Sequence, residues 1–212
     1  MADSGTGTNP KIGVIIGTTR QGRFGEKPAR WIRGLASRRS DLDFEVVDLR
    51  DYPLPLFDEA TGPAMAPPED EVALRFGEKM DRFDGYVFVT AEYNHSIPAV
   101  LKNALDHVYP QCNRKPAAFV GYGTVGGARA VEQLRLVCVE LQMAPTRTAV
   151  HVGFETFSAV MRGDKDLADF DRLNRGVAAM LDELSWWTRT LKAGRDEGES
   201  RGRERTREGS RS

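Results

Sequence analysis

The chain has 212 residues, and 40% of them are hydrophobic, which suits a single domain built around one substantial core. A formal net charge of −1 excludes the strong overall field that attracts nucleic acids or membrane surfaces. The chain shows neither a signal-peptide pattern nor an apolar run of membrane-spanning length, so we expect a cytoplasmic protein without nucleic-acid or membrane partners.

Cysteines and histidines are few and scattered. Cys112 and Cys138 lie far apart and lack a metal-ligand spacing, so we expect free thiols in a reducing compartment. His95, His107 and His151 have no ligand-like neighbours in the sequence, and we therefore predict no metal site.

In chain order, short apolar runs alternate with segments of helical periodicity. The apolar runs at 11–17, 43–49, 84–90, 116–121 and 147–152 predict five strands, and the first and third are apolar enough to be covered on both faces. Apolar residues at helical spacing predict five helices, within 26–39, 69–82, 100–108, 130–141 and 167–191. This alternation predicts an α/β fold with a parallel sheet and helices on both faces.

Both ends of the chain have the composition of disordered segments. Residues 1–10 are mostly small and polar. Residues 193–212 contain six Arg and five acidic residues but no large apolar side chain, so burial cannot offset the entropy of ordering them. We therefore expect one folded domain over residues 11–192.

The loop after the first predicted strand carries the groups of an anion site. It reads GTTRQGRFG over 17–25 and leads into a helix that starts near Glu26. A helix N-terminus offers unpaired N–H groups, and glycines let the backbone approach a ligand closely. An ordinary strand–helix connection is the alternative, because the loop departs from both GxGxxG and GxxxxGKS/T. The presence of Thr18, Arg20 and Arg23 favours phosphate binding, since guanidinium groups bind phosphate with paired hydrogen bonds.

A second polar segment, AEYNHSIP over 91–98, follows the third predicted strand. Packing alone does not explain Glu92, Tyr93 and Asn94 at the end of a buried strand. Tyr93 offers an aromatic surface, and Asn94 offers donors and acceptors for a planar heterocycle. The alternative is a capped turn with Ser96 as the helix N-cap, and the two interpretations are compatible.

A third loop, GYGTVGG over 121–127, follows the fourth predicted strand. Its glycines and Thr124 favour backbone contact with a ligand, and a plain turn into the next helix is the alternative. Ligands of parallel sheets bind outside the carboxyl ends of the strands. The loops after strands one, three and four are therefore expected to converge on one site.

Together these motifs resemble the NADPH-dependent FMN reductase family. The resemblance rests on GTTRQGRFGEKPA, EYNHSIPAVLKNALDH and GYGTVGGARAVEQLR, in this order and spacing, and covers roughly residues 11–190. It implies a flavodoxin-like three-layer sandwich with strand order 2-1-3-4-5, an FMN cofactor, and NADPH or NADH as reductant. The family includes quinone, azo-dye and chromate reductases. Its members commonly form homodimers or homotetramers with the active site near a subunit interface.

The resemblance also assigns FMN contacts residue by residue. The first loop is expected to bind the phosphate, the second to border the isoalloxazine ring, and the third to contact the pyrimidine side of the ring. The corresponding residues are Thr18, Arg20, Arg23, Phe24 and Gly25; Glu92, Tyr93, Asn94, His95 and Ser96; and Gly123, Thr124 and Gly126. Ala91 stands where the family has a proline, which loosens the backbone beside the ring.

The sequence therefore predicts an FMN-dependent NAD(P)H oxidoreductase without a catalytic side chain, because a flavin itself carries the redox chemistry. The expected electron acceptor is a quinone, an azo dye, a metal oxyanion or free flavin. A flavodoxin-like electron carrier and a redox-sensing flavin-binding interaction protein are the alternatives. The near-neutral charge and the arginine-rich loop disfavour the carrier. The choice between NADPH and NADH stays open, with Arg50 and Arg129 as candidate ligands of a 2′-phosphate.

Overall fold

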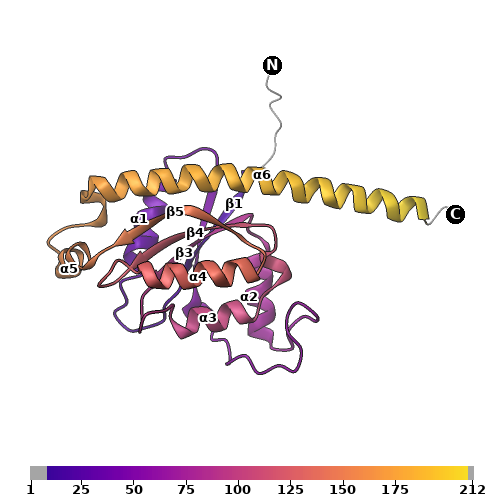
Figure 1. Ribbon diagram of the computed structural model, residues 1–212, viewed down its shortest axis with the longest axis horizontal. Coiled ribbons are helices and arrows are strands. Elements are labelled where there is room, and N and C mark those ends of the chain that lie inside the picture. Colours follow the sequence, from indigo (N-terminus) through magenta and orange to yellow (C-terminus); the bar gives the residue numbers. More distant parts are fainter. Residues whose placement is uncertain (1–8, 210–212) are drawn as a thin grey trace, which may run out of the picture.

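One parallel sheet forms the centre of the computed structural model, which describes residues 9–209 (Figure 1). Its strands are β1 (Lys11–Ile16), β2 (Asp43–Asp48), β3 (Gly85–Ala91), β4 (Pro116–Tyr122) and β5 (Ala144–Val152). All neighbouring strands pair in parallel, in the order β2-β1-β3-β4-β5. The predicted flavodoxin-like strand order is confirmed.

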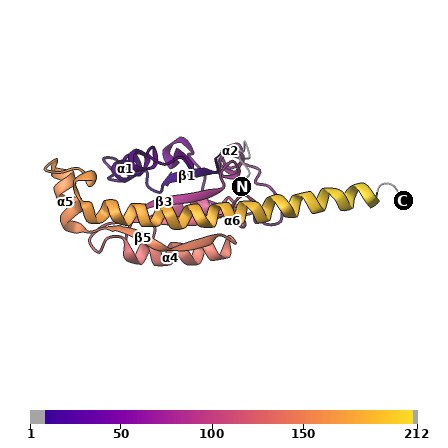
Figure 2. The same cartoon turned by 90° about the horizontal axis from the view of Figure 1, so that it is seen from above.

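Helices cover both faces of this sheet, as predicted (Figures 1 and 2). The helices are α1 (Glu26–Ala36), α2 (Glu71–Asp81), α3 (Ala99–Asp106), α4 (Ala128–Glu140), α5 (Phe154–Arg162) and α6 (Asp171–Gly209), with short 3-10 turns η1 (Leu49–Asp51), η2 (Pro110–Cys112) and η3 (Leu167–Asp169). One core lies between the sheet and α1, α5 and α6, and a second lies between the sheet and α2, α3 and α4.

The first strand shows why the inner strands are apolar throughout. Ile12, Val14 and Ile16 belong to the core under α1 and α6, whereas Ile15 belongs to the core on the opposite face. Successive side chains of a strand point to opposite faces, so a strand covered on both faces needs an apolar residue at nearly every position.

Helix α5 lies where the sequence suggested only a loop. Its apolar residues recur at helical spacing, but only Val160 is buried, and Phe154 and Met161 are 57% and 46% exposed. The helix ends at Gly163, whose φ of +83° suits a glycine C-cap. Strand β5 also begins three residues earlier than expected, at Ala144. Pro145 is tolerated near the start of this strand because β5 lies at the edge of the sheet, where a missing amide donor need not break a hydrogen bond between strands.

The C-terminal segment differs from the disordered tail that we expected over 193–212. Helix α6 instead continues to Gly209 and extends beyond the sheet (Figure 2). Arg and Glu are good helix formers, and Lys192 Nζ and Arg195 Nη2 lie 3.1 and 3.0 Å from an oxygen of Asp84. These ion pairs attach the helix to the amino end of the central strand β3, which Asp84 directly precedes. Among the described helices, none combines the length and the apolarity needed to cross a bilayer.

The two extreme ends, residues 1–8 and 210–212, lie outside the described residues, and so does the disorder predicted for them. The last two residues of the predicted N-terminal segment make defined contacts. Asn9 donates a side-chain hydrogen bond of 3.3 Å to Asp43, and the Pro10 carbonyl accepts one of 3.0 Å from the Asp43 amide.

Both cysteines are free and buried in the core beneath α2, α3 and α4, as the sequence predicted. Burial raises the pKa of the Cys112 thiol to about 12 and also raises the pKa of Cys138. Because only thiolates react readily, these side chains serve packing.

Asp41 provides a pH-dependent link between the start of β2 and helix α6. Arg39 donates to both of its carboxylate oxygens at 2.9 and 2.8 Å, and the Ser185 hydroxyl donates at 2.5 Å. These hydrogen bonds, of which those from Arg39 are strongest, lower the pKa of Asp41 to about 2. The folded-state pKa lies below the unfolded value, so the resulting stability is present above about pH 4 and lost as the pH falls towards 2.

We expect Asp41→Asn to lower the free energy of unfolding at pH 7 by about 1–2 kcal/mol, because the variant loses this ion pair. Urea titrations at pH 7, 4 and 2 measure the effect, and the difference from wild type should shrink between pH 4 and pH 2. Asp58→Asn, at an exposed position, is the control. A difference that stays constant across this pH range would contradict the assignment.

Candidate functional site

The three loops singled out in the sequence lie side by side at the carboxyl ends of β1, β3 and β4. The Tyr122 hydroxyl, from the end of β4, lies 3.3 Å from the Thr18 hydroxyl in the first loop. The Glu92 amide, in the second loop, donates a 3.2 Å hydrogen bond to the Tyr122 carbonyl. The predicted convergence of the loops is therefore present.

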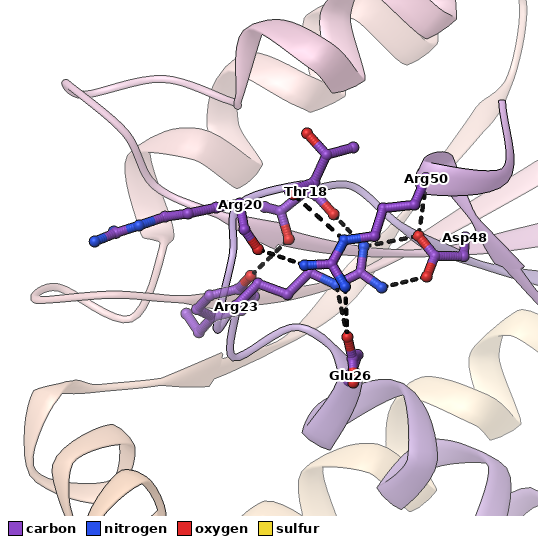
Figure 3. Close-up of polar contacts among 8 residues, drawn as sticks. Thr18, Arg20, Arg23, Glu26, Asp48 and Arg50 are labelled. Carbon is purple, nitrogen blue, oxygen red and sulfur yellow. Dashed lines mark hydrogen bonds and ion pairs between the residues drawn. The ribbon is translucent and has the colours of Figure 1, made fainter. Parts of the chain in front are cut away.

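Arg23 occupies a different place from the one expected of a phosphate ligand (Figure 3). Its side chain is 1% exposed, and the guanidinium donates to Glu26 at 3.1 Å, to both oxygens of Asp48, and to the Thr18 carbonyl. Burial opposes the charge, but the bonds with Asp48 outweigh it and raise the pKa of Arg23. The guanidinium is charged, and four of its five N–H groups donate within the protein. This placement favours an indirect role for Arg23, and its contact with a phosphate stays a prediction.

Phe24 is also turned into the protein. Its ring is buried between Tyr122 and Phe157, with centroid distances of 5.0 and 4.8 Å. Gly25 follows as the N-cap of α1, and a Cβ there would lie 3.0 Å from the Tyr122 hydroxyl. Aromatic packing thus sets the position of the helix start, and only the backbone of these two residues can face a ligand.

The exposed donors of the first loop come from its middle. Within the described residues, the amides of Thr19, Arg20 and Gln21 donate no hydrogen bond, and neither does the guanidinium of Arg20. Figure 3 shows the Arg20 side chain extending away from the group around Arg23. Helix α1 also lacks a side-chain cap, which leaves its first amides available. Free amides, a helix N-terminus and a guanidinium form a donor set that fits a phosphate.

The Glu92 carboxylate in the second loop is held by the first turn of α4, which directly follows the third loop. Its side chain is 5% exposed, accepts 2.5 Å from Arg129 Nε and 3.1 Å from the Arg129 amide, and so caps α4. Arg129, a candidate for a 2′-phosphate, is thereby paired. Glu92 joins the two loops expected around the ring, and its carboxylate is not free for a ligand.

The remaining residues of the second loop form a tight turn. Tyr93 and Ser96 exchange backbone hydrogen bonds of 3.0 and 3.1 Å. Between them, Asn94 and His95 are exposed and have φ values of +49° and +74°. The left-handed region is sparsely used outside glycine, and such backbones concentrate at functional sites. Helix α3 starts after Pro98 without a side-chain cap, so Ser96 is not the N-cap that the sequence suggested.

The glycines of the third loop are required by its backbone. Gly123, Gly126 and Gly127 have φ values of +145°, +71° and +69°, and a Cβ on Gly127 would come within 2.5 Å of the Tyr122 amide. Thr124 at the tip is exposed. The backbone geometry of the turn is sufficient to explain why these positions are glycine. A ligand can reach the exposed polar tip of the loop, at Thr124. Beyond this tip lies a hollow of about 860 Å³, lined also by His151, Phe154 and Arg172.

The sequence alone did not identify several residues that shape the site. Asp48 and Glu26 hold the arginines of the first loop, and Arg50 reaches that loop from η1. Tyr122 is buried, and desolvation raises the pKa of its hydroxyl to about 12, so it is a neutral hydrogen-bonding group. The position of Asp48 at the carboxyl end of β2 was a weak indication that it lies near the site. No sequence spacing predicts its contact with Arg23 in the first loop.

Comparisons with known proteins give matches to one family and one fold. The family model described as NADPH-dependent FMN reductase matches residues 10–156. An NAD(P)H-dependent FMN reductase of Schizosaccharomyces pombe is 41% identical over 145 residues, covering 66% of this chain and 72% of the relative. A 2-hydroxy-1,4-benzoquinone reductase of Burkholderia sp. is 36% identical over 141 residues, covering 63% and 72%. The structure of FerB, a flavoenzyme NAD(P)H:acceptor oxidoreductase of Paracoccus denitrificans, shares the fold with a TM-score of 0.57 and 22% identity, covering 82% and 97%.

We expect Glu92→Gln to lower the free energy of unfolding by about 1–2 kcal/mol, because it removes a charged partner from Arg129 at a buried position. Glu132→Gln, at an exposed position of the same helix, should change it by less than about 0.5 kcal/mol. Chemical denaturation at pH 7 measures both. Equal effects of the two substitutions would show that the pair does not join the loops.

Proposed function

The chain belongs to the NADPH-dependent FMN reductase family, and from this premise we propose that its three converging loops form the FMN site. The protein is an NAD(P)H-dependent oxidoreductase with FMN as its cofactor. The folded domain over 11–192 supplies the site in this proposal. The observation that carries the proposal is the cluster of uncommitted donors in the first loop, at the carboxyl end of the central strands.

The first loop holds the phosphate in this proposal. The amides of Thr19, Arg20 and Gln21, the Arg20 guanidinium and the backbone at Gly25 are its ligands, and together they offer charge-assisted hydrogen bonds. Thr18, Arg23 and Phe24 act indirectly, since their side chains are buried and engaged within the protein.

The second and third loops border the isoalloxazine ring in this proposal. Tyr93 to Ser96 supply an aromatic surface and amide groups, and Gly123, Thr124 and Gly126 supply backbone and hydroxyl groups. Bound FMN supplies the hydride-transfer chemistry. The chain orients the ring, and Glu92 with Arg129 keeps the two loops at a constant separation.

We propose a quinone as the acceptor to test first, with azo dyes, metal oxyanions and free flavin as the other candidates. The Burkholderia relative, named as a benzoquinone reductase, supports this order. NADPH and NADH are both candidate reductants, because Arg50 and Arg129 are each paired with a carboxylate and no longer mark a 2′-phosphate site.

We further propose a cytoplasmic homodimer or homotetramer. Two free thiols suit a reducing compartment. On α4, Leu136 and Val139 are 64% and 60% exposed, and an apolar surface of this kind suits contact between subunits. Size-exclusion chromatography with light scattering tests the assembly.

The activity test uses the purified protein with added FMN. We expect a bound-flavin visible spectrum and NAD(P)H oxidation that depends on both FMN and a benzoquinone, measured at 340 nm for each nucleotide. A protein that stays colourless and binds no added FMN would overturn the proposed site.

Arg20→Ala should weaken FMN binding by about 1.5–3 kcal/mol, because it removes a charge-assisted hydrogen bond to the phosphate. Quenching of flavin fluorescence measures the dissociation constant. Arg33→Ala removes the same charge from an exposed site at the far end of α1 and should leave the constant unchanged. Unchanged affinity in Arg20→Ala would remove Arg20 from the site.

A further inference from the structure

Two guanidinium groups hold three consecutive carbonyls of the first loop (Figure 3). Arg23 donates to the Thr18 carbonyl from the buried side. Arg50 donates to the Thr19 carbonyl at 3.3 Å and to the Arg20 carbonyl at 2.6 Å. Every carbonyl from Thr18 to Arg20 is therefore bound by an arginine from within the protein.

The other ends of the same peptide groups are free. In a trans peptide the C=O and the following N–H point in opposite directions. The carbonyls of residues 18, 19 and 20 share their peptide planes with the amides of Thr19, Arg20 and Gln21. Those three amides have no acceptor within the described residues. Holding the carbonyls on one side thus turns the three amides to the other side, where an anion can accept from them.

Two carboxylates keep the guanidiniums in place. Asp48 accepts two bonds from Arg23, and it also accepts a 2.9 Å bond from the Arg50 amide. Glu26 accepts from Arg23 and from Arg50, at 3.1 Å in each case. The arginines therefore have fixed orientations before any ligand arrives, and the first loop is tied to the end of β2.

We propose that Arg23 and Arg50, held by Asp48 and Glu26, are positioning residues that preorganise the amides of the first loop for the FMN phosphate. This inference rests on the proposed function. The Arg23 side chain is 1% exposed and cannot reach a ligand, so its effect on binding passes through the Thr18 carbonyl. Arg50 is 37% exposed, and each of its three guanidinium nitrogens already donates one hydrogen bond, to Thr19, Glu26 and Arg20 respectively.

The Asp48→Asn variant distinguishes a positioning role of the arginines from a purely electrostatic effect on the FMN phosphate. The substitution makes the neighbourhood of the site more positive, so a purely Coulombic effect would tighten phosphate binding. Loss of positioning weakens it instead, and we expect a dissociation constant for FMN about fivefold or more above wild type. Affinity for riboflavin, which lacks the phosphate, should stay within about twofold, because the second and third loops are unaltered. Fluorescence quenching with FMN and with riboflavin measures both constants.

Asp51→Asn is the matched control, because it makes the same charge change three residues away at an exposed carboxylate. It should leave FMN affinity unchanged or slightly higher. Tighter FMN binding in Asp48→Asn, or equal weakening of FMN and riboflavin, would overturn the proposal. If wild type binds neither flavin, the proposed function itself fails.

Arg50→Ala provides a second test at an exposed position, with thermal melting as the check of folding. We expect this variant to bind FMN more weakly than wild type. Saturating FMN should also slow amide hydrogen exchange over residues 17–22 by a smaller factor in the variant than in wild type. Arg50→Lys should not restore the affinity, since an ammonium group cannot reproduce a fork on two carbonyls. Full recovery in Arg50→Lys would indicate a point charge acting directly on the phosphate and would overturn positioning.

Discussion

The buried pairing of Arg23 with Asp48 is the interaction on which the candidate site depends. A guanidinium taken out of water is tolerated only when its hydrogen bonds and charge are satisfied, and Asp48, Glu26 and the Thr18 carbonyl do so here. The same bonds attach the loop after β1 to the end of β2. The shape of that loop is thus set by charge pairing inside the protein, and its outward amides remain free.

The other two loops are joined on the same principle. Glu92 uses its carboxylate to cap α4 and to pair with Arg129, while Tyr122 links the end of β4 to the first loop through its hydroxyl. Most charged side chains at this edge of the sheet therefore bind the protein itself. Exposed amides, hydroxyls and Arg20 are left to meet a ligand, and such rigid groups bind with less loss of entropy.

The helices show where sequence patterns were sufficient and where they were not. Strands and helices with a fully apolar face were predicted to within a few residues, because burial on the sheet imposes a clear period. Helix α5 was not predicted, although Phe154, Phe157, Val160 and Met161 recur at helical spacing; among its side chains only Val160 is buried. The charged continuation of α6 has no apolar face beyond Leu191, and contacts of Lys192 and Arg195 with the distant Asp84 attach it to the sheet.

The sequence predicted alternating strands and helices and three polar loops at the carboxyl ends of the strands, because apolar runs and glycine placement are local properties of the chain. The family and the strand order followed from the resemblance of its motifs to those of a known family. Tertiary structure alone decided which polar groups of those loops are free. Arg20 and Arg23 are equivalent by residue type and lie three positions apart, yet one is exposed and the other is buried against Asp48. That difference arises from a partner 25 residues away in sequence, which only the pairing of β1 with β2 brings into contact.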